Sequence, residues 1–269
     1  MRILLTNDDG IHAPGFKVLE EIARTLSDDI WIVAPLEEQS AAGHSLTISR
    51  PLRIRQFGER SFGISGTPTD SVMMAVGHLM KDARPDLILS GVNRGANLAE
   101  DVTYSGTVSA AMEGAIMGVR SIALSQVYAR EGMGDSISFA AAQGWGERVV
   151  RALLAQPDRG KTLINVNFPA LPADQVKGIK VARQGFHDVE RNRIVPGVDP
   201  RGYPYFWFGL DHSDAAPRGS DLEASAQGYV TVTPLHFDLT HYELLAELDA
   251  AFSEQPDDRA NNPGDSATS

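Results

Sequence analysis

The chain of 269 residues contains no cysteine. This absence excludes disulfide bonds, thiolate metal ligands and a cysteine nucleophile. Basic residues are also few: 24 lysines and arginines against 35 aspartates and glutamates leave a net charge of −11. A surface of this sign disfavours nucleic-acid polymers and anionic membranes as partners. An anionic substrate would have to be bound locally, through a metal ion, backbone amides or a helix terminus.

Long apolar runs are absent too, and none approaches the ~18 residues that a membrane-spanning helix needs. The first residues have the pattern of a strand, not the basic, apolar and small-residue series of a signal peptide. We therefore predict a soluble, cytoplasmic protein that does not bind membranes.

Several catalytic motifs are missing. The sequence has no Gly-x-Ser-x-Gly nucleophile elbow and no Gly-x-x-x-x-Gly-Lys-Ser/Thr phosphate loop, and its histidines show no His-x-x-His spacing. These absences disfavour Ser-His-Asp catalysis, a P-loop NTPase and a zinc site.

Short apolar runs alternate with helical periodicity up to about residue 166. This alternation predicts an α/β fold with a parallel sheet and helices on both faces. Strands are expected at 3–5, 30–34, 87–89, 122–124 and 163–166, with an exposed two-stranded excursion at 52–57 and 61–65. Helices are expected at 15–27, from Thr67-Pro68 onward, at 106–117 and at 136–155.

The second half of the chain has a different pattern. Strand candidates at 179–182 and 229–232 flank an aromatic, Pro/Gly-rich stretch at 199–209, which predicts an extended arm or hairpin. Exposed aromatics favour an oligomer contact, with an arm folded back on its own domain as the alternative. We predict one α/β domain over 1–252, made of a core to about 180, an arm at 181–235 and a helix at 239–252. Residues 253–269 are expected to be a disordered tail.

Two adjacent carboxylates, Asp8 and Asp9, end the first apolar strand. A buried parallel strand ends at the sheet edge where open α/β sheets bind ligands. Adjacent like charges need a cation or a proton to coexist there. A solvated turn is the alternative, because Asn-Asp-Asp-Gly is good turn chemistry, and Asn7 is expected to hold that turn.

Two further oxygen donors, Ser40 and Asn93, also follow predicted strand ends. Together with Asp8 and Asp9 they form a set of hard oxygen ligands, which suits Mg²⁺ or Mn²⁺ and fits zinc poorly. The sequence therefore predicts one partly protein-ligated divalent ion with positions open to water and substrate.

A phosphate site is indicated by Ser105-Gly106-Thr107, which open the Ala-rich helix at 106–117. Free amides at a helix N-terminus suit a phosphate, although simple capping by Ser105 and Thr107 explains the same residues. A metal and an anion cradle at one sheet edge indicate phosphoryl transfer or hydrolysis. Asp70 could lie near this site or cap a helix, and His44 could donate a proton or be an ordinary loop residue.

Five motifs occur in a fixed order along the chain: Ile-Leu-Leu-Thr-Asn-Asp-Asp-Gly at 3–10, Ala34-Pro35 with Gln39-Ser40 and Gly43, Gly-Thr-Pro-Thr-Asp at 66–70, Ser-Gly-Val-Asn at 90–93 with Gly95 and Asn97, and Tyr-Ser-Gly-Thr at 104–107. In this order they resemble the survival protein E (SurE) nucleotidases, and the resemblance runs from residue 1 to about 250. The chain departs from the family pattern at Ser71, where cysteine is common, and in its polar tail.

The resemblance implies a Rossmann-like core with a C-terminal extension that is exchanged between subunits in homodimers or homotetramers. It implies a divalent-metal-dependent phosphatase acting on nucleoside 5′-monophosphates, with 3′-monophosphates and short polyphosphate as further substrates. It also implies roles for particular residues: catalysis and metal binding by Asp8 and Asp9, metal binding by Ser40 and Asn93, and phosphate binding by Asn97, Ser105, Gly106 and Thr107.

Hydrolysis by metal-activated water is the favoured mechanism, with an aspartyl-phosphate on Asp8 or Asp9 as its variant. Two other classes stay open. A metal-dependent deacetylase also has adjacent aspartates, but Asn7 stands here where a His-Pro pair would be expected. A non-catalytic nucleotide-binding module would bind nucleotide without a metal.

Overall fold

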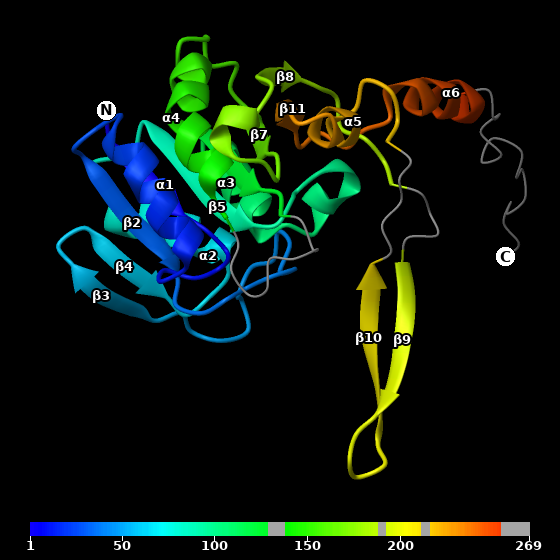
Figure 1. Ribbon diagram of the computed structural model, residues 1–269, viewed down its shortest axis with the longest axis horizontal. Helices are drawn as coiled ribbons and strands as arrows, with labels where there is room; N and C mark the ends of the chain where they lie inside the picture. The colour runs from blue at the N-terminus through cyan, green and yellow to red at the C-terminus, as the bar shows by residue number, and fades with distance from the viewer. Residues whose placement is uncertain (129–137, 188–191, 211–215, 254–269) are drawn as a thin grey trace, which may run out of the picture. The chain divides into compact units, whose positions relative to one another are not determined.

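A nine-stranded, mostly parallel sheet organises the computed structural model, which describes residues 1–128, 138–187, 192–210 and 216–253 (Figure 1). The strand order is β3-β4-β2-β1-β5-β6-β7-β11-β8. The bounds are β1 (Ile3–Thr6), β2 (Ile30–Pro35), β3 (Ile54–Gly58), β4 (Ser61–Ile64), β5 (Leu87–Arg94), β6 (Arg120–Gln126), β7 (Thr162–Phe168), β8 (Ile179–Val181) and β11 (Val230–His236).

The central strand β1 pairs in parallel with β2 on one side and with β5 on the other. Its apolar residues Ile3, Leu4 and Leu5 have no exposed surface, because helices cover both faces of the sheet. The chain turns from β1 first to β2 and later to β5. The carboxyl ends of β1 and β5 therefore meet where the winding direction reverses, which is the usual ligand-binding point of such sheets.

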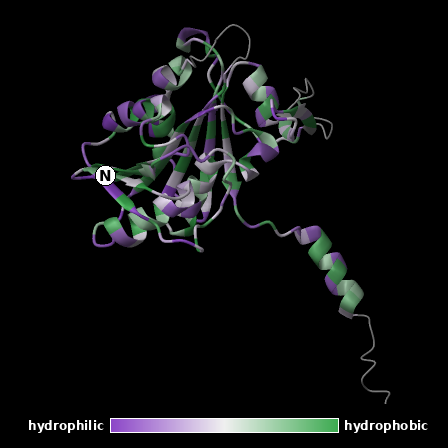
Figure 2. Ribbon diagram, turned by 90° about the horizontal axis from the view of Figure 1, so that it is seen from below, coloured by the Kyte–Doolittle hydropathy of each residue, from purple (hydrophilic) through white to green (hydrophobic). Residues whose placement is uncertain are grey.

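Two pairs of helices cover the two faces of the sheet. The cluster on one face includes Phe16 and Leu19 of α1 (Pro14–Arg24) and Val149 of α4 (Ala140–Leu154). The cluster on the other face includes Val72 of α2 (Pro68–Met74) and Ala110 of α3 (Gly106–Ile116). In Figure 2 the hydrophobic colouring is concentrated in the strands between these helices. The predicted α/β class with helices on both faces is confirmed.

The small residues of α3 allow it to lie close to the sheet. A methyl group at Gly114 would come within 2.4 Å of Ser121 Oγ and 2.5 Å of Ile88 Cδ1. Any larger side chain there would push the helix outward, and with it the N-terminal turn of α3.

The prediction of an exposed two-stranded excursion at 52–65 is wrong for its second strand. β3 is exposed and pairs antiparallel with β4, but β4 joins the main sheet in parallel beside β2. Phe62 and Ile64 alternate onto the face that packs against α2, so both are buried.

Several boundaries differ from the sequence-based expectations. β5 runs on through Ser90 to Arg94, with an irregular pairing to β6 between Ser90 and Asn93. α2 continues into a π-helical turn, η1 (Ala75–Leu79). α4 begins at Ala140, and the part of its prediction at 136–137 lies outside the described residues. The 3₁₀ turns are η2 (Ala99–Thr103) and η3 (Ala173–Gln175).

The region predicted as an arm contains more than an arm. β9 (Asn192–Val198) and β10 (Pro204–Leu210) form an antiparallel hairpin, which is the predicted extended element. The chain then forms a short helix, α5 (Asp221–Ala226), that sequence patterning missed, and β11 returns to the main sheet between β7 and β8.

The chain divides into two compact units, Met1–His236 and Phe237–Ser269. The second unit contains α6 (Tyr242–Ser253), close to the helix expected at 239–252. The tail from residue 254 lies outside the described residues, so its disorder stays a prediction, as does the extent of the single domain to residue 252. Among the described residues no helix is long and apolar enough to cross a membrane.

Candidate metal and phosphate site

Asp8 and Asp9 follow β1 at the point where the winding of the sheet reverses. The turn is held by Asn7, whose side-chain Nδ2 donates to the carbonyl of Gly10 at 2.8 Å. This bond confirms Asn7 as the turn residue. It also directs the two following carboxylates toward the carboxyl edge of the sheet.

Asp8 is buried against the first turn of α3, with 5% of its surface exposed. The hydroxyl of Thr107 donates to Asp8 Oδ1. A methyl group at Gly106 would come within 2.7 Å of the Asp8 Cβ, so only glycine allows this close approach. Burial raises the pKa of Asp8 to about 6; the Asp9 charge raises it as well, whereas the hydrogen bond from Thr107 lowers it.

Asp9 lies beside the end of β5. Its Oδ2 accepts a hydrogen bond from the backbone amide of Arg94 at 2.9 Å. Burial raises the pKa of the Asp9 carboxyl and the Glu38 charge adds to the rise, while the amide and charge of Arg94 lower it. The raised pKa values show that the protein does not neutralise the negative charges of these two adjacent carboxylates. A bound cation would supply the missing positive charge.

Ser40 lies on the loop after β2, and that loop is tied to the aspartate pair. The amide of Gln39 donates to the carbonyl of Asp8 at 2.8 Å. The Ser40 hydroxyl donates to Glu38 Oε1 at 2.7 Å, which leaves its oxygen lone pairs available to another partner. Sequence patterning missed Glu38, because one acidic residue in an exposed loop carries no distinguishing pattern.

Asn93 lies next to Arg94 at the end of β5. Its Nδ2 donates to the carbonyl of Gly95 at 3.0 Å, so its amide oxygen Oδ1 is the atom that a cation would take. The irregular stretch before it depends on Gly91, which has a φ of 134° and where a Cβ would lie 2.1 Å from the carbonyl oxygen of Leu124.

The donor set fits a hard divalent cation. It consists of two carboxylates, one hydroxyl and one amide oxygen, and the described residues contain no cluster of three His, Cys, Asp or Glu side chains. Two buried oxygens near the pair, Asn7 Oδ1 and Ser90 Oγ, also have no hydrogen-bond partner within the described chain. An all-oxygen set of this kind suits Mg²⁺ or Mn²⁺ and disfavours zinc.

Ser105 is the N-cap of α3, and its hydroxyl accepts a hydrogen bond from the amide of Val108 at 3.1 Å. Capping, one of the two explanations considered for this turn, is therefore correct for Ser105. Thr107 has another partner, because its hydroxyl is bound to Asp8. The first-turn amides remain the groups that suit an anion, and phosphate binding at Ser105, Gly106 and Thr107 stays a prediction.

Asn97 belongs to a buried polar network that sequence patterning missed. Its Nδ2 donates to Ser125 Oγ at 2.8 Å, and its amide donates to Asn167 Oδ1 at 2.8 Å. Asn165 and Asn167 donate to its carbonyl at 2.7 and 3.0 Å. Asn165 and Asn167 are two residues apart on a buried strand, so both lie on one face of β7. Two buried amides on one face need a hydrogen-bond partner, and this pattern could have predicted a polar network here.

Asp70 and His44 have structural partners. Asp70 completes a capping box with Thr67 at the start of α2, and its Oδ1 accepts the amide of Thr47 at 3.0 Å. This confirms the capping interpretation of Asp70. His44 Nε2 lies 3.0 Å from Glu113 Oε2 of α3.

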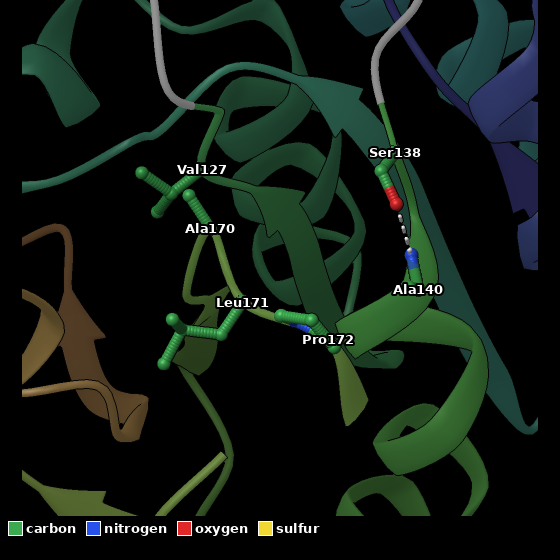
Figure 3. Close-up of a pocket in the computed structure, with 6 residues that line it drawn as sticks. All are labelled: Val127, Ser138, Ala140, Ala170, Leu171 and Pro172. Carbon is green, nitrogen blue, oxygen red and sulfur yellow. Dashed lines mark hydrogen bonds between the residues drawn. The ribbon is translucent and has the colours of Figure 1, made fainter. Parts of the chain in front are cut away.

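A separate hollow of about 440 Å³ lies past the ends of β6 and β7 (Figure 3). Its lining is Val127, Ser138, Ala140, Ala170, Leu171 and Pro172, and the Ser138 hydroxyl accepts the amide of Ala140 at 3.3 Å. None of the described residues that line it carries a charged side chain.

The fold and the site define an α/β protein with an acidic, oxygen-rich candidate site at the carboxyl edge of its sheet. The profile of the family described as Survival protein SurE matches residues 3–191. The chain belongs to the SurE family.

Relatives and a solved structure agree with this assignment. The chain is 59% identical to the 5′-nucleotidase SurE of Erythrobacter litoralis, over 94% of this chain and all of that protein. It is 62% identical to the 5′-nucleotidase SurE of Rhizorhabdus wittichii, with the same coverage. The crystal structure of the SurE protein from Aquifex aeolicus superposes with a TM-score of 0.81 at 39% identity, covering 94% of this chain and 100% of that one.

Proposed function

We propose that this protein is a divalent-metal-dependent phosphatase that hydrolyses nucleoside 5′-monophosphates to nucleoside and phosphate. One observation carries the proposal: two adjacent carboxylates, Asp8 and Asp9, lie at the switch point of the sheet, and Asp8 is buried and hydrogen-bonded to Thr107 in the first turn of α3. The activity named for the two relatives, 5′-nucleotidase, agrees with this chemistry.

Asp8, Asp9, Ser40 and Asn93 would hold one Mg²⁺ or Mn²⁺ per subunit through their oxygen atoms. When bound, the ion supplies charge neutralisation for the phosphoryl oxygens and makes water more acidic. Asp8 and Asp9 act as its anionic ligands, and the Thr107 hydrogen bond orients Asp8 for that role.

The phosphate would be bound by the chain itself at the start of α3. The positive end of the α3 helix dipole at this turn favours an anion, and Thr107 of the same turn is hydrogen-bonded to Asp8. Asn97 would contribute to the same site, and three hydrogen bonds with Asn165 and Asn167 hold its backbone in place. Positioning of this kind supplies most of the acceleration in phosphoryl transfer.

Direct attack by water is favoured over an aspartyl-phosphate. Both carboxylates already have partners, Thr107 for Asp8 and the Arg94 amide for Asp9, and both would be shared with the cation. Such a carboxylate is a poor nucleophile. Rapid-quench experiments with radiolabelled nucleotide should trap no phosphoenzyme, and an acid-stable, base-labile label on the protein would overturn this mechanism.

The substrate range includes, as part of the proposal, 3′-monophosphates and short polyphosphate. The cytoplasmic location stays a prediction from the sequence.

Self-association into dimers or tetramers through the β9–β10 hairpin is proposed as well. The hairpin exposes Phe206, Trp207 and Phe208, and Phe208 keeps 91% of its surface in solvent. Aromatics of this size favour a protein partner surface. Replacing the three by serine should shift the mass in solution toward the monomer, and an unchanged mass would exclude the hairpin as the contact.

A phosphate-release screen tests the proposed reaction. AMP and other 5′-monophosphates should be hydrolysed with Mg²⁺ or Mn²⁺ and not with EDTA. Metal-independent AMP binding without turnover would favour the non-catalytic module, and zinc-dependent release of acetate from acetylated substrates would favour the deacetylase.

A further inference from the structure

The backbone of Arg94 is held beside the aspartate pair, whereas its side chain makes a long contact that another partner can replace. Its amide donates to Asp9 Oδ2 at 2.9 Å, while its Nη2 lies 3.5 Å from Glu38 Oε1. The two side chains of this ion pair are 54% and 52% exposed. A pair this long and this exposed contributes little to stability, so the guanidinium can leave Glu38 at little cost.

The negative charge of the site favours a cationic side chain, in addition to the metal ion, when a phosphate substrate binds. Asp8 and Asp9 are adjacent carboxylates, and Glu38 adds a third negative charge close enough to raise the pKa of Asp9. One divalent ion leaves this set negative, and a phosphate monoester adds up to two more negative charges. Arginine is suited to this task because its planar donor fork matches phosphate oxygens.

We propose that Arg94 is a phosphate-binding residue of this site, and that Glu38 holds its guanidinium in the ligand-free protein. The inference rests on the proposed phosphatase function for its substrate. Glu38 also accepts the Ser40 hydroxyl at 2.7 Å, so the same carboxylate holds both a candidate metal ligand and the phosphate-binding side chain. Arrival of a phosphate transfers Arg94 from Glu38 to the phosphate oxygens.

This arrangement predicts opposite effects for the two partners of one ion pair. Arg94→Gln removes a charge-assisted contact with phosphate, so phosphate affinity should fall ~10- to 100-fold. Glu38→Gln removes a competitor and a repelling charge, so phosphate affinity should rise by up to ~5-fold. A purely structural ion pair predicts the same direction for both variants, because each breaks the pair.

The experiment titrates inorganic phosphate into the full-length protein saturated with Mn²⁺, by calorimetry, for wild type, Arg94→Gln and Glu38→Gln. A separate Mn²⁺ titration without phosphate should show that Arg94→Gln keeps or tightens the metal affinity. Arg60→Gln is the matched control: it removes the same charge from an exposed ion pair, with Asp29 at 2.9 Å, before the amino ends of β2 and β4. Its phosphate affinity should equal that of wild type.

Weaker phosphate binding in both Arg94→Gln and Glu38→Gln, or unchanged binding in Arg94→Gln, would overturn the proposal. So would a wild-type protein that does not bind phosphate with Mn²⁺ present. Arg94-dependent phosphate binding without hydrolysis of any nucleotide would instead overturn only the proposed reaction.

Discussion

The candidate site has a buried half and an exposed half. In the buried half, Asp8 is enclosed by the first turn of α3 and hydrogen-bonded to Thr107. In the exposed half, Glu38, Ser40 and Arg94 are joined by contacts that remain open to water. The buried half is preorganised, which suits binding of a fixed charge, whereas the exposed half can rearrange when a ligand arrives. Substitutions in the two halves should therefore have different consequences.

Asp9→Asn should have the largest effect, because it removes one ligand charge from the proposed metal site. Turnover of AMP should fall at least ~100-fold, while the fold survives. Steady-state kinetics with saturating Mn²⁺ and circular dichroism measure the two properties. Asp29→Asn is the control, since Asp29 is a surface carboxylate paired with Arg2 and Arg60. Wild-type turnover in Asp9→Asn would refute the assignment.

Asp8→Asn should stabilise the metal-free protein. The folded-state pKa of Asp8 is raised from 3.8 to about 6, so the folded protein holds this proton more tightly than the unfolded chain. Stability is then lost as the pH rises from about 4 to 6, and the loss above pH 6 is about 2–3 kcal/mol. The variant should recover it, and its advantage should disappear toward pH 4. Urea unfolding in EDTA between pH 4 and 8 measures this profile.

Asp221→Asn supplies the matched control for that experiment. Asp221 is also buried, but its two carboxylate oxygens accept amides of Ala99, Gly185 and Leu222 at 2.8–2.9 Å. An asparagine cannot accept on both sides, so this variant should lose about 1–3 kcal/mol. If both variants lost stability alike, Asp8 would be an ordinary structural carboxylate.

Gly106→Ala tests how closely the buried half is packed. Its Cβ would lie 2.7 Å from the Asp8 Cβ and 3.0 Å from Pro68 Cγ, so α3 has to shift. We expect a loss of about 1–3 kcal/mol in unfolding free energy, with weaker Mn²⁺ binding. Gly77→Ala, with no atom within 4 Å of its Cβ, should be neutral or stabilising by up to about 1 kcal/mol. Equal effects in thermal unfolding would contradict the close approach.

Ser40→Ala should have the smallest effect of the four. The residue is exposed and its loop is held by the backbone bond from Gln39 to Asp8, so water can replace the hydroxyl. Mn²⁺ affinity measured by calorimetry should fall by less than ~10-fold. A loss as large as that of Asp9→Asn would show that the exposed half is as rigid as the buried one.

Much of the fold could be predicted because its elements have strong local patterns. The apolar runs of β1, β2 and β5 and the periodicity of α1 and α3 determine element type without tertiary information. The elements that were missed or misplaced are β4, β9 and α5, which are short or have patterns shared with loops. Their structure depends on neighbours that are distant in the sequence, such as β2 for β4.

For the site, the sequence by itself determined the chemistry of the donors: Asp8, Asp9 and Ser40 follow strands, Asn93 lies in the last residues of β5, and parallel strands bring such ends to one edge. Only the tertiary structure decided which partner each group has. Thr107 binds Asp8 across 99 residues and the Arg94 amide binds Asp9 across 85. The raised pKa of Asp8 and the position of Arg94 beside Asp9 follow from those partners. They were not readable from the sequence, because burial and hydrogen bonding arise only when distant segments pack together.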